Sequence, residues 1–204
     1  MLNRRVLLHW LLASLPLLLA LGWTFAAFDS EADVHTFMLR HRAAHPLLKD
    51  ATKILTDWGN AAVYAVYAWL LFTGLRRKDR CRTRLAVVYI VVQLAVALVL
   101  VHVLKFVIGR PRPDVDGLFR SMSTHSRYHS MPSGHTTEIS GAVLPLAMRA
   151  KSTLAVLGMG LYLGAVGYSR VYLGWHHPSD VLCGWLLGSV AALAIHLFSC
   201  EDRT

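Results

Sequence analysis

Long apolar stretches alternate with short polar segments along this chain. A helix that crosses a bilayer needs about 20 mostly apolar residues. Four stretches meet or approach that length, namely residues 6–28, 85–108, 154–168 with their flanks, and 181–198. Two weaker windows, residues 61–75 and 136–148, are shorter, and Glu138 and Pro145 interrupt the second one. The pattern predicts an all-α, polytopic membrane protein.

The order of these windows predicts six transmembrane helices in a single integral-membrane domain, residues 1–204. The expected spans are residues 6–28, 60–75, 85–108, 136–149, 152–169 and 179–198. The weak fourth window is kept as a span because neighbouring helices can bury its polar side chains. Between the first two spans, residues 29–60 place apolar side chains at helical spacing. This spacing predicts one or two short amphipathic helices at the membrane interface.

The composition agrees with a bilayer environment. The 204 residues are 55% hydrophobic and 16% charged, which is too apolar for an ordinary soluble domain of this length. The net charge is +9, and part of it is concentrated in the basic run from Arg76 to Arg84, between two expected spans. Short loops rich in arginine and lysine stay on the cytoplasmic side of a membrane. The charge therefore does not indicate nucleic-acid binding.

The first apolar stretch sets the expected orientation of the chain. Arg4 and Arg5 precede it, which favours a cytoplasmic N-terminus. A cleaved signal peptide is the alternative, but the apolar run of about 23 residues exceeds the usual length of about 7 to 15. Six crossings return the C-terminus to the cytoplasm. The expected location is the cytoplasmic (inner) membrane.

Three polar clusters lie beside the apolar stretches. They are residues 105–113 (KFVIGRPRP), 132–135 (PSGH) and 169–180 (SRVYLGWHHPSD). Charged groups at a membrane are costly to keep, so such clusters indicate a functional site. In the six-span scheme an even number of crossings separates the clusters. All three are then expected on the periplasmic side, opposite the basic run.

The residue types in these clusters suit phosphate chemistry. A transferring phosphoryl group spreads negative charge over its oxygens, and Lys105, Arg112 and Arg170 would stabilise that charge. Ser133 and Gly134 precede a predicted helix, where backbone N–H groups can bind an anion. Two histidines could then divide the reaction, one attacking phosphorus and the other protonating the leaving oxygen.

The third cluster also pairs a histidine with a carboxylate. His176 and Asp180 are four residues apart at the start of the last span, which is about one helical turn. At this spacing Asp180 can hold the imidazole in one tautomer and stabilise its charged form.

Together the clusters resemble the type 2 phosphatidic-acid phosphatase superfamily, which also includes vanadium haloperoxidases. The lysine, six-residue, Arg-Pro motif matches Lys105, Arg112 and Pro113. The Pro-Ser-Gly-His motif stands at residues 132–135. The last motif matches Ser169, Arg170, His176 and Asp180. All three motifs occur in the family order and with the full spacing.

The resemblance implies a role for each matched residue. His176 would be the nucleophile that forms a phosphohistidine, Asp180 its orienting carboxylate, and His135 the general acid toward the leaving group. The implied phosphate-binding residues are Lys105, Arg112, Ser133, Gly134 and Arg170. No metal or other cofactor is implied, and no obligatory protein partner is expected.

The implied activity is a membrane lipid phosphate phosphatase that releases inorganic phosphate. Its substrate would be a lipid phosphate such as undecaprenyl diphosphate, phosphatidylglycerol phosphate, phosphatidic acid or lipid A 1-phosphate. Three alternatives stay open: phosphotransfer between two lipids, vanadium haloperoxidase chemistry, and a catalytically inactive lipid-binding relative. The last of these is expected to lack one of His135, His176 and Asp180, all of which are present.

Several other polar residues have no assigned role from the sequence. Glu138 is a candidate for pairing with a site cation, for orienting a histidine, or for capping the helix start. Loop residues that could contact a lipid headgroup or simply be solvated are Arg120, His125, Arg127 and His129. Histidines expected to pack between helices are His9, His102 and His196. The cysteines, Cys81, Cys183 and Cys200, show no paired spacing and are expected to be inert.

Overall fold

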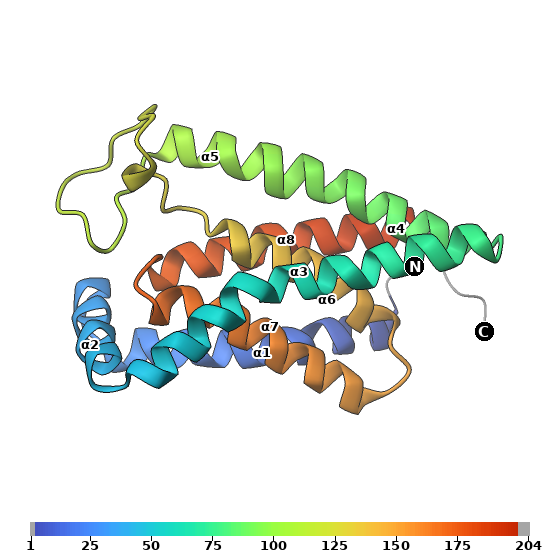
Figure 1. Ribbon diagram of the computed structural model, residues 1–204, viewed down its shortest axis with the longest axis horizontal. Helices are drawn as coiled ribbons and strands as arrows, with labels where there is room; N and C mark the ends of the chain where they lie inside the picture. The colour runs from blue at the N-terminus through green and yellow to red at the C-terminus, as the bar shows by residue number, and fades with distance from the viewer. Residues whose placement is uncertain (1–2, 200–204) are drawn as a thin grey trace.

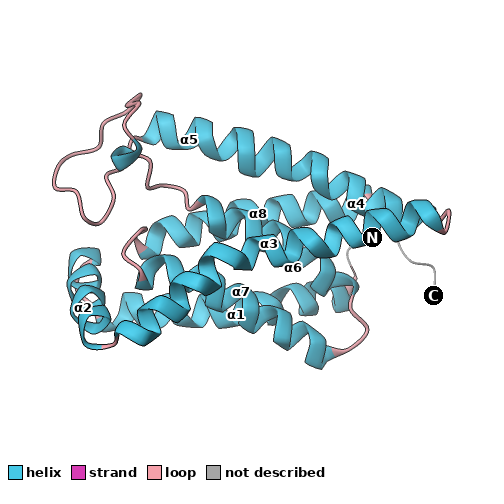
Figure 2. Cartoon of the chain, in the orientation of Figure 1, coloured by secondary structure: helices cyan, strands magenta, loops and turns pink. Residues whose placement is uncertain are grey.

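The computed structural model describes residues 3–199, and all regular secondary structure in that range is helical (Figures 1 and 2). The elements are α1 (Arg4–Ala27), α2 (Glu31–Ala44), α3 (Pro46–Arg76), α4 (Arg80–Gln93), a π-helical segment η1 (Leu94–Leu100), α5 (Val101–Ile108), a short 3-10 turn η2 (Ser126–Tyr128), α6 (Gly134–Arg149), α7 (Thr153–Tyr172) and α8 (Pro178–Phe198). The all-α fold expected from the hydrophobic pattern is confirmed.

Four helices in the described part of the chain are long and apolar enough to cross a membrane. They are α1, the continuous α4–η1–α5 helix (Arg80–Ile108), α7 and α8. The chain is therefore a multi-pass membrane protein. Two of the six expected spans do not meet these criteria: α6 has only 16 residues, and α3 begins with the polar segment expected at the interface.

The boundary expected near residue 60 is wrong. One uninterrupted helix, α3, runs from Pro46 to Arg76 and joins the second expected interfacial helix to the second expected span. Pro46 at its first turn fits the place where a missing N–H is harmless. Only α2, with its N-cap Ser30, is a separate short helix between α1 and α3.

Helix α6 lies at the centre of the bundle, between α1, α7 and α8. Its close partner is α8, and two glycines allow the approach. A Cβ on Gly188 would lie 2.4 Å from the Cβ of Ser140, and one on Gly184 would lie 2.5 Å from the Ser133 carbonyl oxygen. Small residues at such contacts let helix backbones pack closely in a membrane. This packing brings the start of α6 against the start of α8.

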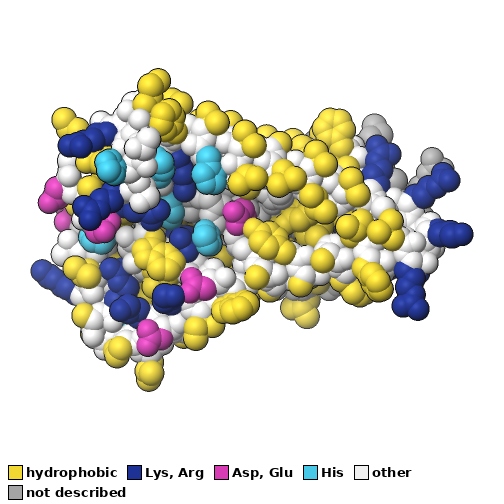
Figure 3. All heavy atoms as spheres, turned by 45° about the horizontal axis from the view of Figure 1, so that its top comes forward, with side chains coloured by type: hydrophobic (Ala, Val, Ile, Leu, Met, Phe, Trp, Pro, Cys, Tyr) yellow, Lys and Arg dark blue, Asp and Glu magenta, His cyan; other side chains and the backbone are white. Residues whose placement is uncertain are grey.

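The outer surface of the bundle is apolar along its middle. Large exposed side chains there include Leu19, Trp69, Phe72 and Leu161. Figure 3 shows hydrophobic side chains along the length of the visible face, with charged side chains gathered at its two ends. A band of this kind is what a lipid environment requires of a helical bundle.

The two ends of the bundle differ in composition. At one end Arg5 donates to the Ala150 carbonyl, and Arg84 donates to the Phe198 carbonyl. The α3–α4 turn with the basic run lies at this end, and α2, the long loop after α5 and the α7–α8 turn lie at the other (Figure 1). The three polar clusters are therefore together, at the end of the bundle opposite the basic run.

Candidate active site

Gly109 shapes the first cluster by ending α5 in the left-handed conformation, with φ of 62°. Glycine adopts this conformation without the strain that a Cβ causes. The Gly109 N–H donates to the Lys105 carbonyl over 3.0 Å, and its carbonyl accepts from Arg120 over 2.7 Å. A Cβ at this position would lie 1.8 Å from the Arg120 carbonyl oxygen. The turn places Lys105 on the helix and Arg112 on the loop that follows.

The second cluster forms the start of α6. Ser133 is the N-cap residue and is buried, and its N–H donates to the Asp180 carbonyl over 2.9 Å. Gly134 is close to the first cluster, because a Cβ there would lie 3.8 Å from Nζ of Lys105. His135 follows in the first turn of α6, where the charges of Lys105 and Arg170 act on it.

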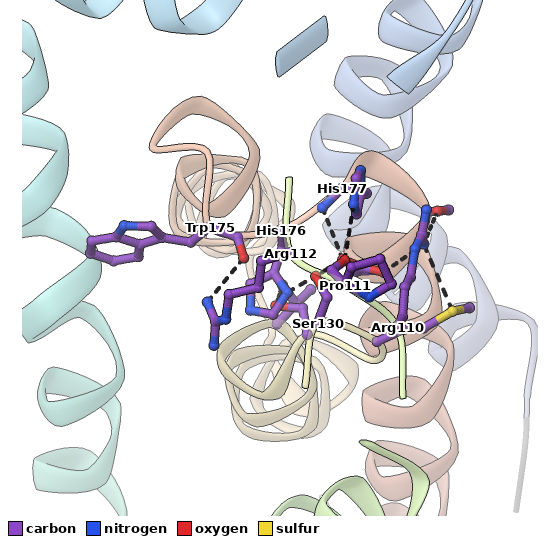
Figure 4. A network of polar contacts seen from close by, with 12 residues as sticks. Arg110, Pro111, Arg112, Ser130, Trp175, His176 and His177 are labelled. Carbon is purple, nitrogen blue, oxygen red and sulfur yellow. Dashed lines mark hydrogen bonds and ion pairs between the residues drawn. The ribbon is translucent and has the colours of Figure 1, made fainter. Parts of the chain in front are cut away.

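Arg170 and Arg112 hold the loop that contains the third cluster. Arg170 lies in the last turn of α7, donates to Oγ1 of Thr56 over 2.9 Å and lies 4.3 Å from the centre of the Trp175 ring. A cation over an aromatic face is attracted by the ring. Arg112 donates to the Trp175 carbonyl over 3.1 Å, as Figure 4 shows. Two guanidinium groups thus contact the residue immediately before His176.

Lys105, Arg112 and Arg170 form a group of cations without carboxylate partners. They are close enough for the charges of Arg112 and Arg170 to act on Lys105. Within residues 3–199, none of the three has a carboxylate oxygen within 4.0 Å. Like charges gathered at a membrane protein surface are unfavourable unless an anion joins them. The arrangement is suited to bind a phosphate.

Asp180 is the centre of the hydrogen-bond network at the start of α8, and its side chain is fully buried. Oδ1 accepts from Nη1 of Arg110 over 2.6 Å. Oδ2 accepts from Oγ of Ser130 over 2.6 Å and from the His177 N–H over 2.9 Å. The last bond is part of a capping box that begins α8. The carboxylate is therefore held on both oxygens.

His176 lies beside Asp180, as their spacing predicts. Its Nδ1 is 3.5 Å from Oδ2 of Asp180, which is too long for a good hydrogen bond. Burial lowers the pKa of His176 to about 4, and the nearby Asp180 carboxylate offsets only part of this effect. The imidazole is consequently neutral at pH 7. Nε2, the other ring nitrogen, is left for contact with a substrate.

The structure brings all eight sequence-predicted site residues to one place, but it also adds residues that the sequence did not single out. Glu31 of α2 contacts Nη2 of Arg110, and Arg110 in turn contacts Asp180. Ser130 is a further partner of Asp180. In the sequence, the one indication of this network is that Arg110 lies two residues before Arg112. Its acidic partner is 79 residues away along the chain.

The geometry answers the question left open for Glu138 and gives a structural role to His177. The carboxylate of Glu138 accepts from Nδ2 of Asn60 over 2.5 Å and from Oη of Tyr64 over 2.8 Å. Glu138 therefore joins α6 to α3 and does not cap the helix start. His177 is the N-cap residue of α8, and its Nε2 lies 3.3 Å from the Pro111 carbonyl.

Comparison with known proteins gives a family match that includes all three clusters. The model of the PAP2 superfamily matches residues 85–202. The chain is 34% identical over 136 residues to an undecaprenyl-diphosphatase of Sulfolobus acidocaldarius, with 65% of each chain covered. It is 28% identical over 158 residues to a lipid A 1-phosphatase of Rhizobium etli, with 69% of this chain and 67% of the relative covered. The matches span about two thirds of these relatives' length. No solved structure gives a significant match.

Proposed function

Since the chain belongs to the PAP2 superfamily, we propose that it is a membrane lipid phosphate phosphatase. It hydrolyses a phosphomonoester or diphosphate of a lipid through a phosphohistidine intermediate and releases inorganic phosphate. The observation that supports this most directly is the group of three cations near the buried His176, namely Lys105, Arg112 and Arg170, which have no carboxylate partner within residues 3–199.

In this proposal the phosphate is bound by the three cations and by the N–H groups at the start of α6. Arginine donates two parallel hydrogen bonds to phosphate, and helix N-termini favour anions. Ser133 and Gly134 contribute the helix start. The positive charges stabilise the equatorial oxygens as the bond to the leaving group lengthens.

The covalent steps use the two histidines. Neutral His176 attacks phosphorus with Nε2, while His135 gives a proton to the departing oxygen of the lipid. Asp180 stabilises the positive imidazole ring of the phosphohistidine through Nδ1. A water then attacks phosphorus, with His135 accepting its proton, and phosphate leaves His176. The reaction needs no metal ion.

The membrane arrangement follows the same proposal. Helices α3 and α6 complete six spans of one domain, and α6 can be short and partly polar because its neighbours bury it. The site faces the periplasm, and both termini are cytoplasmic. Support comes from the basic Arg76 to Arg84 run, which lies at the opposite end from the site and follows the positive-inside rule.

The substrate class is a lipid with a terminal phosphate or diphosphate. The undecaprenyl-diphosphatase and lipid A 1-phosphatase relatives favour an isoprenyl diphosphate or a lipid A 1-phosphate. Phosphatidylglycerol phosphate and phosphatidic acid belong to the same chemical class. Transfer of the phosphoryl group to a second lipid is the alternative reaction of the same intermediate. Because His135, His176 and Asp180 are all present, the sequence argues against a catalytically inactive relative.

A panel of lipid phosphates tests the proposal. We expect the purified protein in detergent with EDTA to release phosphate from at least one of them without any added acceptor. His176→Ala should abolish release, and the exposed variant His45→Ala should retain it. Absence of release from every lipid phosphate by the wild type contradicts the phosphatase assignment. Full activity of His176→Ala contradicts the assignment of the nucleophile.

A further inference from the structure

Helix α2 connects the two helix ends between which His176 lies. It crosses the site end of the bundle (Figure 1) and buries Val34, Met38 and Arg42 along one face. Arg42 donates to the Tyr172 carbonyl at the end of α7. At the other end of α2, Glu31 accepts from the N–H of Ser179 over 2.9 Å and from its Oγ over 2.7 Å. Both ends of the loop that contains His176 are thus joined to α2.

Glu31 also contacts the site through Arg110. Nη2 of Arg110 donates to Oε2 of Glu31, and Nη1 donates to Oδ1 of Asp180 over 2.6 Å. Figure 4 shows Arg110 beside Ser130, His176 and His177. The Arg110 side chain is 11% exposed and the Asp180 side chain is fully buried. A continuous series of contacts therefore runs from Glu31 through Arg110 and Asp180 to His176.

The charges in this series matter for the nucleophile. Arg110 alone would neutralise Asp180, because a buried carboxylate paired with one guanidinium presents little net charge to its surroundings. Glu31 is a second carboxylate on the same guanidinium, so the three side chains carry a net charge of −1. The neighbour that this negative charge can stabilise is His176, whose ring becomes positive when Nε2 bonds to phosphorus.

We propose that Glu31 and Arg110 are positioning residues for the reaction. Arg110 fixes the orientation of the Asp180 carboxylate, and Glu31 maintains the negative charge that Asp180 directs toward His176. Neither residue contacts the phosphate. The inference rests on the proposed function of His176 as the nucleophile. Helix α2 then contributes to the active site together with the three sequence clusters.

Glu31→Gln is the informative substitution because it removes the charge of the side chain and keeps its size. We expect kcat to fall about 10-fold to 100-fold, because the neutral amide forms a weaker hydrogen bond with Arg110 and no longer contributes a negative charge. KM for the lipid phosphate should stay within about two-fold, because substrate-binding contacts are unchanged. The rate of phosphoenzyme formation in rapid-quench experiments should fall by the same factor as kcat.

Arg110 provides the second arm of the test. Arg110→Gln should lower kcat at least as much as Glu31→Gln, and Arg110→Lys should recover part of the loss because it restores one charged donor. The double variant Glu31→Gln with Arg110→Gln should be no worse than Arg110→Gln alone, since Glu31 acts through Arg110. Asp33→Asn is the matched control. Asp33 lies in the same first turn of α2, and within residues 3–199 its carboxylate accepts a hydrogen bond only from Oγ of Ser30, so kcat should not change.

The results separate this inference from the proposed function. A wild-type kcat in folded Glu31→Gln, or a loss confined to KM, overturns the positioning role even where His176→Ala is inactive. Full activity of His176→Ala overturns the nucleophile assignment itself. The unfolding temperature of each variant is measured in parallel. If Glu31→Gln does not fold, Arg110→Gln decides in its place, and a wild-type kcat in folded Arg110→Gln contradicts the inference.

Discussion

Replacing Asp180 by asparagine isolates the effect of its charge on His176. The side chains have almost the same shape, so the start of α8 can keep its packing. Oδ2 of Asp180 is 3.5 Å from Nδ1 of His176. With an effective dielectric constant of about 20, a unit negative charge at this distance stabilises a positive imidazole by about 5 kcal/mol. Because the ring is positive only after it attacks phosphorus, most of this energy is lost from the transition state.

A loss of this size corresponds to a fall in kcat of about 1000-fold or somewhat more. Phosphate release at saturating lipid phosphate measures it, with KM determined in the same experiment. Folding should be affected less, by about 1 to 3 kcal/mol, because Arg110 keeps Glu31 as a partner. A folded Asp180→Asn protein with kcat within 10-fold of wild type would refute the reasoning. Thermal unfolding in detergent establishes that the variant is folded.

Two further predictions concern stability. Gly109→Ala should destabilise the protein by at least about 1 to 3 kcal/mol, because its Cβ would lie 1.8 Å from the Arg120 carbonyl oxygen at a φ of 62°. Gly158→Ala is the control, because a Cβ there meets nothing within 4 Å, and it should be neutral or stabilising. Equal changes in unfolding temperature for Gly109→Ala and Gly158→Ala would contradict the argument. The second prediction is a pH dependence, since burial lowers the pKa of His176 from 6.5 to about 4. The unfolded chain therefore binds this proton more tightly than the folded protein does. The neutral, buried His176 contributes about 3 kcal/mol to the free energy of unfolding above pH 6.5, and this contribution is lost as the pH falls toward 4. In denaturant unfolding between pH 7 and 4, the loss of stability in His176→Ala should be smaller than in the wild type by about this amount.

The hydrophobic pattern predicted the long helices because lipid exposure demands apolar side chains on every outward face. It was less accurate where helices are covered by protein. Helix α6 is buried on most of its surface, so its sequence contains Thr136, Ser140 and Glu138, and hydropathy underrates it. The break expected near residue 60 was wrong because a change from polar to apolar composition does not end a helix. Pro46 begins α3, and the helix continues through Gly59 and Asn60. These residue types often end a helix, but here Asn60 packs against α6 and Gly59 against α7.

Motif spacing predicted eight candidate site residues, and the structure brings them together at one end of the bundle. The same reasoning could not find Glu31. Its side chain reaches Arg110, 79 residues away, and Ser179, 148 residues away. On the sequence it is one of several acidic residues at the start of an amphipathic helix.

By itself, the sequence determined that this is a helical membrane protein, and it predicted a cluster of cations suited to phosphate together with a histidine–aspartate pair. Those properties depend on local composition and on spacing within one helical turn. Only the tertiary structure decided how Asp180 shares its two oxygens between Arg110, Ser130 and His177, and that α2 joins this network. Such contacts depend on how α2, the loop after α5 and the start of α8 meet at one end of the bundle. That meeting is set by helix packing over the whole chain and not by any single motif.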